Sequence, residues 1–199
     1  MLAIRNRQQF QTPPWANAGP TNWKSQEFEI FPFTYKETIE YKKKNGITIQ
    51  ENDFDEYLEF GGMPQRFEEI DIEGVRNYLT SIYGSIIQKD VFETHKKINK
   101  NDFDRVSKYI ISTTGKKFSA LSIAKYLKQG LPLDKQKAYS ETIHNYARYL
   151  EECYFLTECK PYYLKGKEAL SGVKKYYAID SGLRSALGNI LELDDTFAL

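Results

Sequence analysis

At 199 residues, with 41% hydrophobic and 15% aromatic side chains, the chain has the composition of a folded globular protein rather than a disordered one. Two cysteines, Cys153 and Cys159, exclude a disulfide-rich scaffold and a four-cysteine zinc site, and we expect both to be reduced. No apolar run approaches the ~20 residues of a membrane-spanning helix, and the N-terminus has no signal-peptide pattern. The sequence therefore predicts a cytoplasmic protein without a membrane partner.

The net charge of +1 hides an asymmetry along the chain. Residues 27–73 contain 13 acidic and 5 basic side chains, whereas residues 89–137 contain 12 basic and 5 acidic ones. Such segments can orient a protein toward a charged partner, or they can simply face water or each other. Both interpretations stay open.

The first part of the chain predicts an irregular segment followed by a helical, lid-like subdomain over residues 27–98. Residues 1–26 combine prolines and tryptophans without periodicity, and the alternation over 27–31 predicts a short strand. Thr34 and Glu37 form a capping-box pattern that begins a helix ending near Lys44, before Asn45-Gly46.

Two more helices are predicted in this subdomain. One covers Asp53–Phe60, with Phe54, Tyr57 and Leu58 on one side, and Gly61-Gly62 ends it. The other begins at Gly74 and ends near Glu93. Its apolar residues recur every three or four positions, which is typical of an amphipathic helix.

Residues 99–180 predict three helices followed by two strands, which is the order of a winged helix. The expected elements are the helices Phe103–Thr113, Ser119–Gln129 and Ser140–Glu152 and the strands Tyr154–Leu164 and Lys174–Ile179. A final helix and tail are expected over 181–199. The predicted fold class is thus mainly α, with a helical lid-like subdomain followed by a winged helix with a small two-stranded β-ribbon.

A winged helix can place its third helix in the major groove of DNA while the wing contacts phosphates. The candidate base-contacting residues lie off the apolar stripe of the third helix: Thr142, His144, Asn145 and Arg148. The candidate phosphate-contacting residues are Lys116, Lys117, Lys165 and Lys167. The same helix also carries Glu141, Glu151 and Glu152, so the alternative is a module that only packs between other domains.

Three other patterns are considered as possible sites. Glu158-Cys159-Lys160, with Asp134 upstream, fits half of a PD-(D/E)xK nuclease site. The two histidines and two cysteines have no recognised metal-binding or nucleophile spacing, so we predict neither a metal site nor a catalytic residue. Asp180 precedes a short helix and is interpreted as its N-cap.

Several strings in the chain together resemble one family. They are EIFPFTYKE (29–37), YLEFGGMP (57–64), SIIQKDV (85–91), FSALSIAKYLK (118–128), TIHNYARYLEECYFL (142–156), YYLKGKEAL (162–170) and KKYYAIDSGLRSAL (174–187). This pattern resembles the bacterial and archaeal AAA-type ATPases that carry a C-terminal domain of unknown function. In that family an ATP-binding domain precedes a helical lid and a winged helix, and a nuclease-like domain follows.

The resemblance implies that this chain corresponds to the middle of such a protein, with the ATPase core and the nuclease-like domain as its partners. ATP and magnesium are implied only for the full-length family, because neither Gly-Lys pair here, Gly115-Lys116 nor Gly166-Lys167, belongs to a phosphate-binding loop. We therefore expect no cofactor in this chain. The expected function is a non-catalytic lid and winged-helix portion of an ATPase-like protein that can contact DNA. The alternatives are a free-standing winged-helix DNA-binding regulator and a nuclease fragment.

Overall fold

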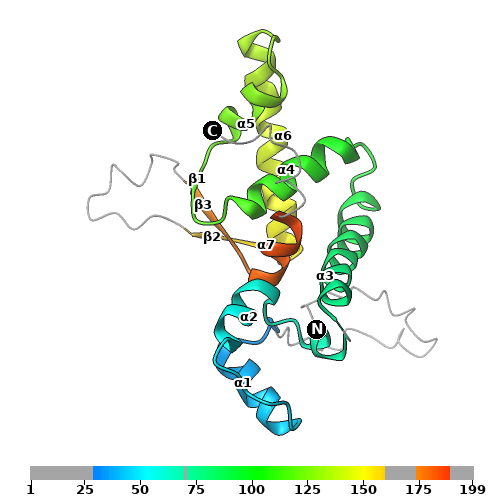
Figure 1. Ribbon diagram of the computed structural model, residues 1–199. Helices are drawn as coiled ribbons and strands as arrows, with labels where there is room; N and C mark the ends of the chain where they lie inside the picture. Colours follow the sequence, from blue (N-terminus) through cyan, green and yellow to red (C-terminus); the bar gives the residue numbers. More distant parts are fainter. Residues whose placement is uncertain (1–28, 70, 160–173, 189–199) are drawn as a thin grey trace, which may run out of the picture.

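The computed structural model describes residues 29–69, 71–159 and 174–188 and shows a mainly helical protein with one small antiparallel sheet (Figure 1). The N-terminal half contains α1 (Tyr35–Lys44), α2 (Asp53–Phe60), the 3₁₀-helix η2 (Pro64–Glu68), α3 (Ile72–Ile86) and the π-helix η3 (Ile87–Phe92). The C-terminal half contains α4 (Lys100–Ser112), β1 (Lys117–Phe118), α5 (Ala120–Leu127), α6 (Leu133–Glu152), β2 (Leu156–Cys159), β3 (Lys174–Ala178) and α7 (Ser181–Gly188). The predicted class, a mainly α protein with a small β element, is confirmed.

Helix α1 begins and ends where the sequence predicts. The Thr34 hydroxyl accepts a hydrogen bond from the Glu37 amide at 3.3 Å, and the Glu37 carboxylate accepts one from the Thr34 amide at 2.8 Å. Gly46, with φ +68°, follows the C-cap Asn45. The strand predicted for 27–31 is wrong over its described residues. Residues 29–31 form no strand, and Ile30 and Phe31 are more than half exposed, so the alternation there does not mark a buried face.

Because this capping box is local and well formed, Thr34→Ala is expected to lower the free energy of unfolding by about 1 kcal/mol. The measurement is urea unfolding followed by circular dichroism. Thr48→Ala, a change at an exposed residue outside any helix, is the control and should have little effect. Equal stability of the two variants would contradict the prediction.

Helix α2 has the predicted bounds, but a different side of it is buried. Phe54 is 50% and Leu58 is 49% exposed, whereas Asp53 and Phe60 are buried. The predicted apolar side is therefore wrong for these two residues. The reason is that Phe60 packs toward α7 while Asp53 turns inward to meet the Lys42 ammonium at 2.8 Å.

The sheet has three strands in the order β1-β3-β2. The prediction of a two-stranded ribbon is therefore wrong by one strand. Lys117 lies opposite Lys175, and β2 pairs with the other edge of β3, both in antiparallel register. The strand predicted to begin at Tyr154 begins at Leu156, because Tyr154 adopts φ +59° and turns the chain.

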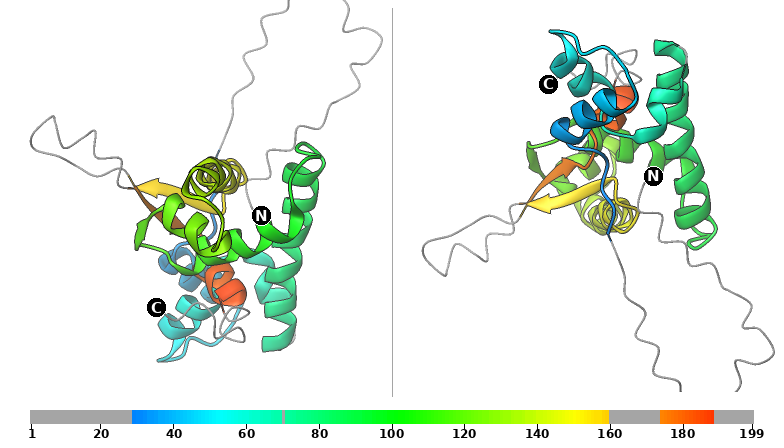
Figure 2. Two further views of the ribbon diagram at one scale, coloured as in Figure 1. Left: turned by 90° about the horizontal axis from the view of Figure 1, so that it is seen from above. Right: turned by 90° about the horizontal axis from the view of Figure 1, so that it is seen from below.

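Helix α6 begins seven residues before the predicted start at Ser140. Ser140 does not cap it. Its hydroxyl instead donates to the Lys137 carbonyl at 2.6 Å, a bond that a serine can make inside a helix. With 20 residues, α6 is about 30 Å long and forms the spine of the C-terminal half in Figures 1 and 2.

One apolar core lies where α3, α4, α6 and α7 converge. Leu79, Phe103, Ile143 and Leu187, one from each helix, are all fully buried. Helix α7 also joins this core to α2, because the buried Asp180 carboxylate accepts hydrogen bonds from the Leu183 amide at 2.9 Å and from the Gly62 amide at 2.8 Å. The predicted N-cap role of Asp180 is confirmed, and the bond to Gly62 adds a link between distant segments.

Candidate nucleic-acid interface

The candidate residues of α6 point in three different directions. Thr142 and Asn145 line a surface cavity on one flank of the helix. His144 lies on the opposite flank, where its ring packs edge-on against Phe118, 5.5 Å between centroids. Arg148 lies on the exposed ridge between the flanks and pairs with Glu152 at 3.5 Å. The structure therefore does not gather these four side chains into one surface for reading bases.

The flank that carries His144 leads to an exposed basic group on β1 and β3. Lys116 and Lys117 are exposed, as predicted for phosphate contacts, and Lys117 lies directly opposite the exposed Lys175. None of the ion pairs among the described residues involves these three lysines. Like charges directly opposite each other destabilise a sheet, so the arrangement suits a bound anion. We call Lys116, Lys117 and Lys175 the sheet lysines.

Neighbouring charges set this group apart from Lys174, the adjacent residue on β3. The Lys174 ammonium contacts the Glu158 carboxylate at 2.6 Å, and this bond raises the pKa of Lys174. Burial, with a smaller contribution from the Lys174 charge, lowers the pKa of His144, so its imidazole stays neutral at pH 7. His144 thus contributes a ring contact rather than a positive charge.

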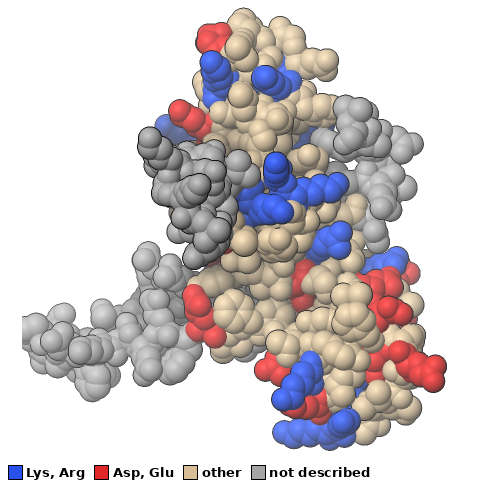
Figure 3. Space-filling view, turned by 90° about the vertical axis from the view of Figure 1, so that its left-hand side faces the viewer, with Lys and Arg blue, Asp and Glu red and all other residues tan. Residues whose placement is uncertain are grey.

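Figure 3 shows how charge is distributed over the face that carries the sheet. Lys and Arg form a group at mid-height and also occur near the top and at the lower end, whereas Asp and Glu are more frequent in the lower part of the view, where α1 and α2 lie. A cavity of about 580 Å³ beside α1 and α2 has carboxylates among its lining residues: Asp55, Glu56, Glu59, Glu69 and Asp71. The acidic side chains of this face are thus more frequent around α1 and α2 than at mid-height.

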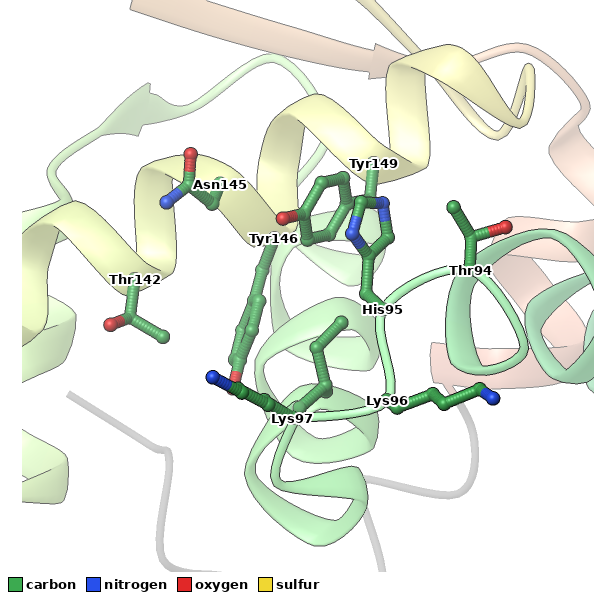
Figure 4. A pocket seen from close by; sticks show the side chains of 9 residues that line it. Thr94, His95, Lys96, Lys97, Thr142, Asn145, Tyr146 and Tyr149 are labelled. Carbon is green, nitrogen blue, oxygen red and sulfur yellow. The ribbon is translucent and has the colours of Figure 1, made fainter.

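The cavity on the other flank of α6 has a volume of about 510 Å³ and lies between α6 and the segment 94–98 (Figure 4). Its lining residues are Thr94, His95, Lys96, Lys97, Ile98, Thr142, Asn145, Tyr146 and Tyr149. We call it the α6 cavity. Its lining carries two exposed lysines and no carboxylate, which makes it electropositive.

Sequence reasoning located part of this interface. It named Lys116, Lys117, Thr142 and Asn145, but it missed the lysines of segment 94–98 and Lys175. The Lys96-Lys97 and Lys174-Lys175 pairs were visible signals, yet only the tertiary structure brings them to the flanks of α6. Lys165 and Lys167 lie outside the described residues.

The residues considered for other chemistry do not form a site. Asp134 lies in the first turn of α6 and Glu158 follows its far end, so the structure does not bring the two acids of the nuclease pattern together; Lys160 lies outside the described residues. Cys153 and His95 line the same small cavity, but burial raises the pKa of the Cys153 thiol to about 12, which leaves it unreactive.

No group of three or more metal-ligating side chains lies close together among the described residues. Within the same part of the chain, every helix is too short or too polar to cross a membrane.

A family model described as a domain of unknown function (DUF8612) matches residues 51–195. The chain belongs to this family. A protein of Haemophilus influenzae (strain ATCC 51907 / DSM 11121 / KW20 / Rd), named only as an uncharacterized protein, is 23% identical over 159 residues. The match covers 79% of this chain and 38% of that relative, so the chain spans well under half of the relative's length. No solved structure matches the DUF8612 chain.

Proposed function

We propose that this chain is the non-catalytic lid and winged-helix portion of an ATPase-like protein, and that its C-terminal half contacts the phosphates of nucleic acid. The order of the elements supports the winged-helix part. The elements α4, β1, α5, α6, β2 and β3 follow one another as helix, strand, helix, helix, strand, strand, and the three strands form one sheet. The ATPase-like part rests on the resemblance of the sequence strings alone.

The observation that carries the phosphate contact is the group of sheet lysines. They are exposed, close together and without a carboxylate partner among the described residues, and β1 and β3 hold Lys117 and Lys175 in a fixed register. Phosphate contacts of this kind position a protein on nucleic acid without reading its sequence. The paired Arg148 on the α6 ridge agrees with such a mode, because its charge is already balanced by Glu152.

The test is a salt titration of DNA-duplex binding by fluorescence anisotropy. The triple variant Lys116→Ala/Lys117→Ala/Lys175→Ala is expected to weaken binding and to flatten the log–log salt dependence by about 0.9 for each phosphate that the variant no longer neutralises. The matched control replaces three exposed lysines of α1, Lys36, Lys43 and Lys44, and should leave affinity nearly unchanged. No binding at low salt, or an equal weakening in the control, would contradict the proposal and leave domain packing as the function.

Two further measurements separate the alternatives. A free-standing regulator should prefer one sequence strongly over unrelated duplexes of equal length, whereas phosphate contacts alone give little preference. The purified chain is expected to release no phosphate from ATP, because no residue here is assigned to nucleotide hydrolysis. ATP hydrolysis at an enzymatic rate would overturn the non-catalytic assignment.

A further inference from the structure

The α6 cavity contains features that a duplex phosphate contact does not use. Its volume of about 510 Å³ lies within the range of small-ligand sites, roughly 300–1,000 Å³, and is large enough for one nucleotide. Three chemistries converge in it: lysine charge from the segment 94–98, polar groups from Thr142 and Asn145, and aromatic rings (Figure 4). In a nucleotide, the phosphate can pair with lysine charge, the base edge can bond to polar groups, and the base face can stack on an aromatic ring.

The aromatic wall is fixed in place. The His95 ring stacks on Tyr149 with centroids 4.1 Å apart and an interplanar angle of 22°. Two backbone hydrogen bonds hold the turn that carries His95, from its amide to the Val91 carbonyl at 2.7 Å and from the Ile98 amide to the His95 carbonyl at 3.1 Å. The segment therefore does not have to order itself when a ligand binds, which limits the entropic cost of binding.

The rest of the lining offers polar groups to a base edge, whereas the Tyr146 ring is 3% exposed and packs on Phe103. In Figure 4 the Tyr146 ring extends from α6 toward Lys97, and Asn145 and Thr142 lie beside it on the same helix. Burial and the nearby Asp102 charge raise the pKa of Tyr146, so its hydroxyl stays protonated. The Asn145 amide carries both a donor and an acceptor, the combination that a base edge can satisfy.

The charges of the cavity select an anion. Lys96 and Lys97 are exposed, and no ion pair among the described residues involves them. No Asp or Glu lines the cavity. In the cavity beside α1 and α2, by contrast, the lining residues Lys42 and Arg66 both pair with Glu56. The difference argues that the lysines of the α6 cavity are placed to bind negative charge rather than to balance the protein's own acids.

We propose that the α6 cavity binds one unpaired nucleotide of a nucleic-acid strand, with its phosphate at Lys97, whose side chain runs toward Tyr146 in Figure 4, and its base against the His95–Tyr149 wall. This inference rests on the proposed function and extends it, because it names nucleic acid with a single-stranded end or gap as the substrate class. A paired base cannot enter, since its faces and edge are occupied in the duplex. The sheet lysines would then hold the duplex on the other flank of α6.

The test compares three probes: a blunt duplex, the same duplex with a single-stranded extension, and a free nucleoside monophosphate. The extension is expected to raise affinity about 5- to 100-fold, the effect of stacking one base. Asn145→Ala, a change at an exposed side chain that should not disturb folding, and His95→Ala are expected to remove most of this advantage while blunt-duplex binding stays unchanged. Lys44→Ala on α1 is the control and should change the binding of neither duplex.

The outcomes separate this inference from the proposed function. Equal affinity for the blunt and extended duplexes, or an advantage that survives in Asn145→Ala, overturns the cavity inference while leaving the sheet lysines as the duplex contact. Tight binding of the free monophosphate, as strong as that of the extended duplex, also overturns it, because the ligand would then be a mononucleotide. Loss of duplex binding only in the sheet-lysine triple variant supports the proposed function independently.

Discussion

Gly182→Ala is expected to lower the free energy of unfolding by about 3 kcal/mol, although alanine is normally the better helix former. Gly182 is the second residue of α7, and a Cβ atom on it would overlap the Phe60 carbonyl oxygen and lie 2.8 Å from the Gly61 nitrogen. Both contacts are backbone atoms, which cannot rotate aside. Helix α7 would therefore have to move away from the end of α2.

The surrounding contacts make that movement costly. The buried Asp180 carboxylate bonds to the Gly62 amide, and the Gly62 carbonyl accepts from the Phe33 amide at 2.8 Å. Burial raises the pKa of Asp180, and backbone amides oppose that effect by stabilising the charged form. The Ser181 hydroxyl also donates to the Tyr57 carbonyl at 2.9 Å. Displacing α7 would leave these buried polar groups without partners, which adds to the steric cost.

Gly84→Ala is the matched control. Gly84 also lies in a helix, α3, but a Cβ atom there has no neighbour within 4 Å. This variant is expected to be as stable as the parent chain or more stable by up to about 1 kcal/mol. Thermal unfolding measures both changes, with a decrease of about 6–12 °C expected for Gly182→Ala. If both glycine variants were stabilised, the close packing of α7 on α2 would be refuted.

The features that could be predicted from the sequence are those encoded within three or four residues. The capping pair Thr34 and Glu37 is confirmed at the predicted residues, and the helix predicted to begin at Ser119 begins one residue later, with Ser119 as its N-cap. Gly61, which ends α2 with φ +71°, is confirmed as well. In each case the signal and the group that it satisfies lie next to each other in the chain, so no tertiary contact is needed to interpret the pattern.

The features that were missed depend on residues far apart in the sequence. Strand β1 has only two residues and exists because Lys117 and Phe118 pair with β3, more than fifty positions away. The inward orientation of Asp53 depends on Lys42, and nothing in the pattern of α2 shows that an ammonium group lies there. The same limit applies to the candidate site. Lys116 and Lys117 were identifiable as exposed charges. That Lys175 lies beside them follows only from the strand register.

The second large effect is expected from the buried ion pair of the N-terminal half. The Lys42 side chain reaches the carboxylates of Asp53 and Glu56, both at 2.8 Å, and Glu56 also contacts the Arg66 guanidinium at 3.0 Å. Lys42 is 4% and Asp53 is 2% exposed, so water screens this pair poorly. Lys42→Met keeps the length of the side chain but leaves Asp53 buried without its partner. We expect a loss of about 3–5 kcal/mol at pH 7.

The pKa shifts of the pair give the pH window of its stabilisation. Burial alone raises the pKa of Asp53, but hydrogen bonds from Lys42 and the Gln50 amide outweigh it and hold the pKa below its ordinary value. Burial likewise lowers the pKa of Lys42, but the bonds to Asp53 and Glu56 outweigh it and raise the pKa. The stabilisation is therefore complete between the ordinary pKa values, about 4 and about 10.4. It is lost as pH falls through the pKa of Asp53 or rises through that of Lys42.

In Lys42→Met, the effect of burial on Asp53 is no longer opposed by Lys42, so the pKa of Asp53 should rise. The folded variant should then gain stability as pH falls, because Asp53 takes up a proton. The ion pair keeps its full contribution to the parent chain down to about pH 4, so the gap between the two must narrow from pH 7 toward pH 4 because the variant gains stability. Adding Asp53→Asn to Lys42→Met should remove this pH dependence of the variant, because the buried group then carries no charge. Urea unfolding at a series of pH values measures the gap, with Lys43→Met, at the exposed neighbouring position, as the control. A gap that stays constant with pH would show that the buried charge of Asp53 is not the cause of the loss.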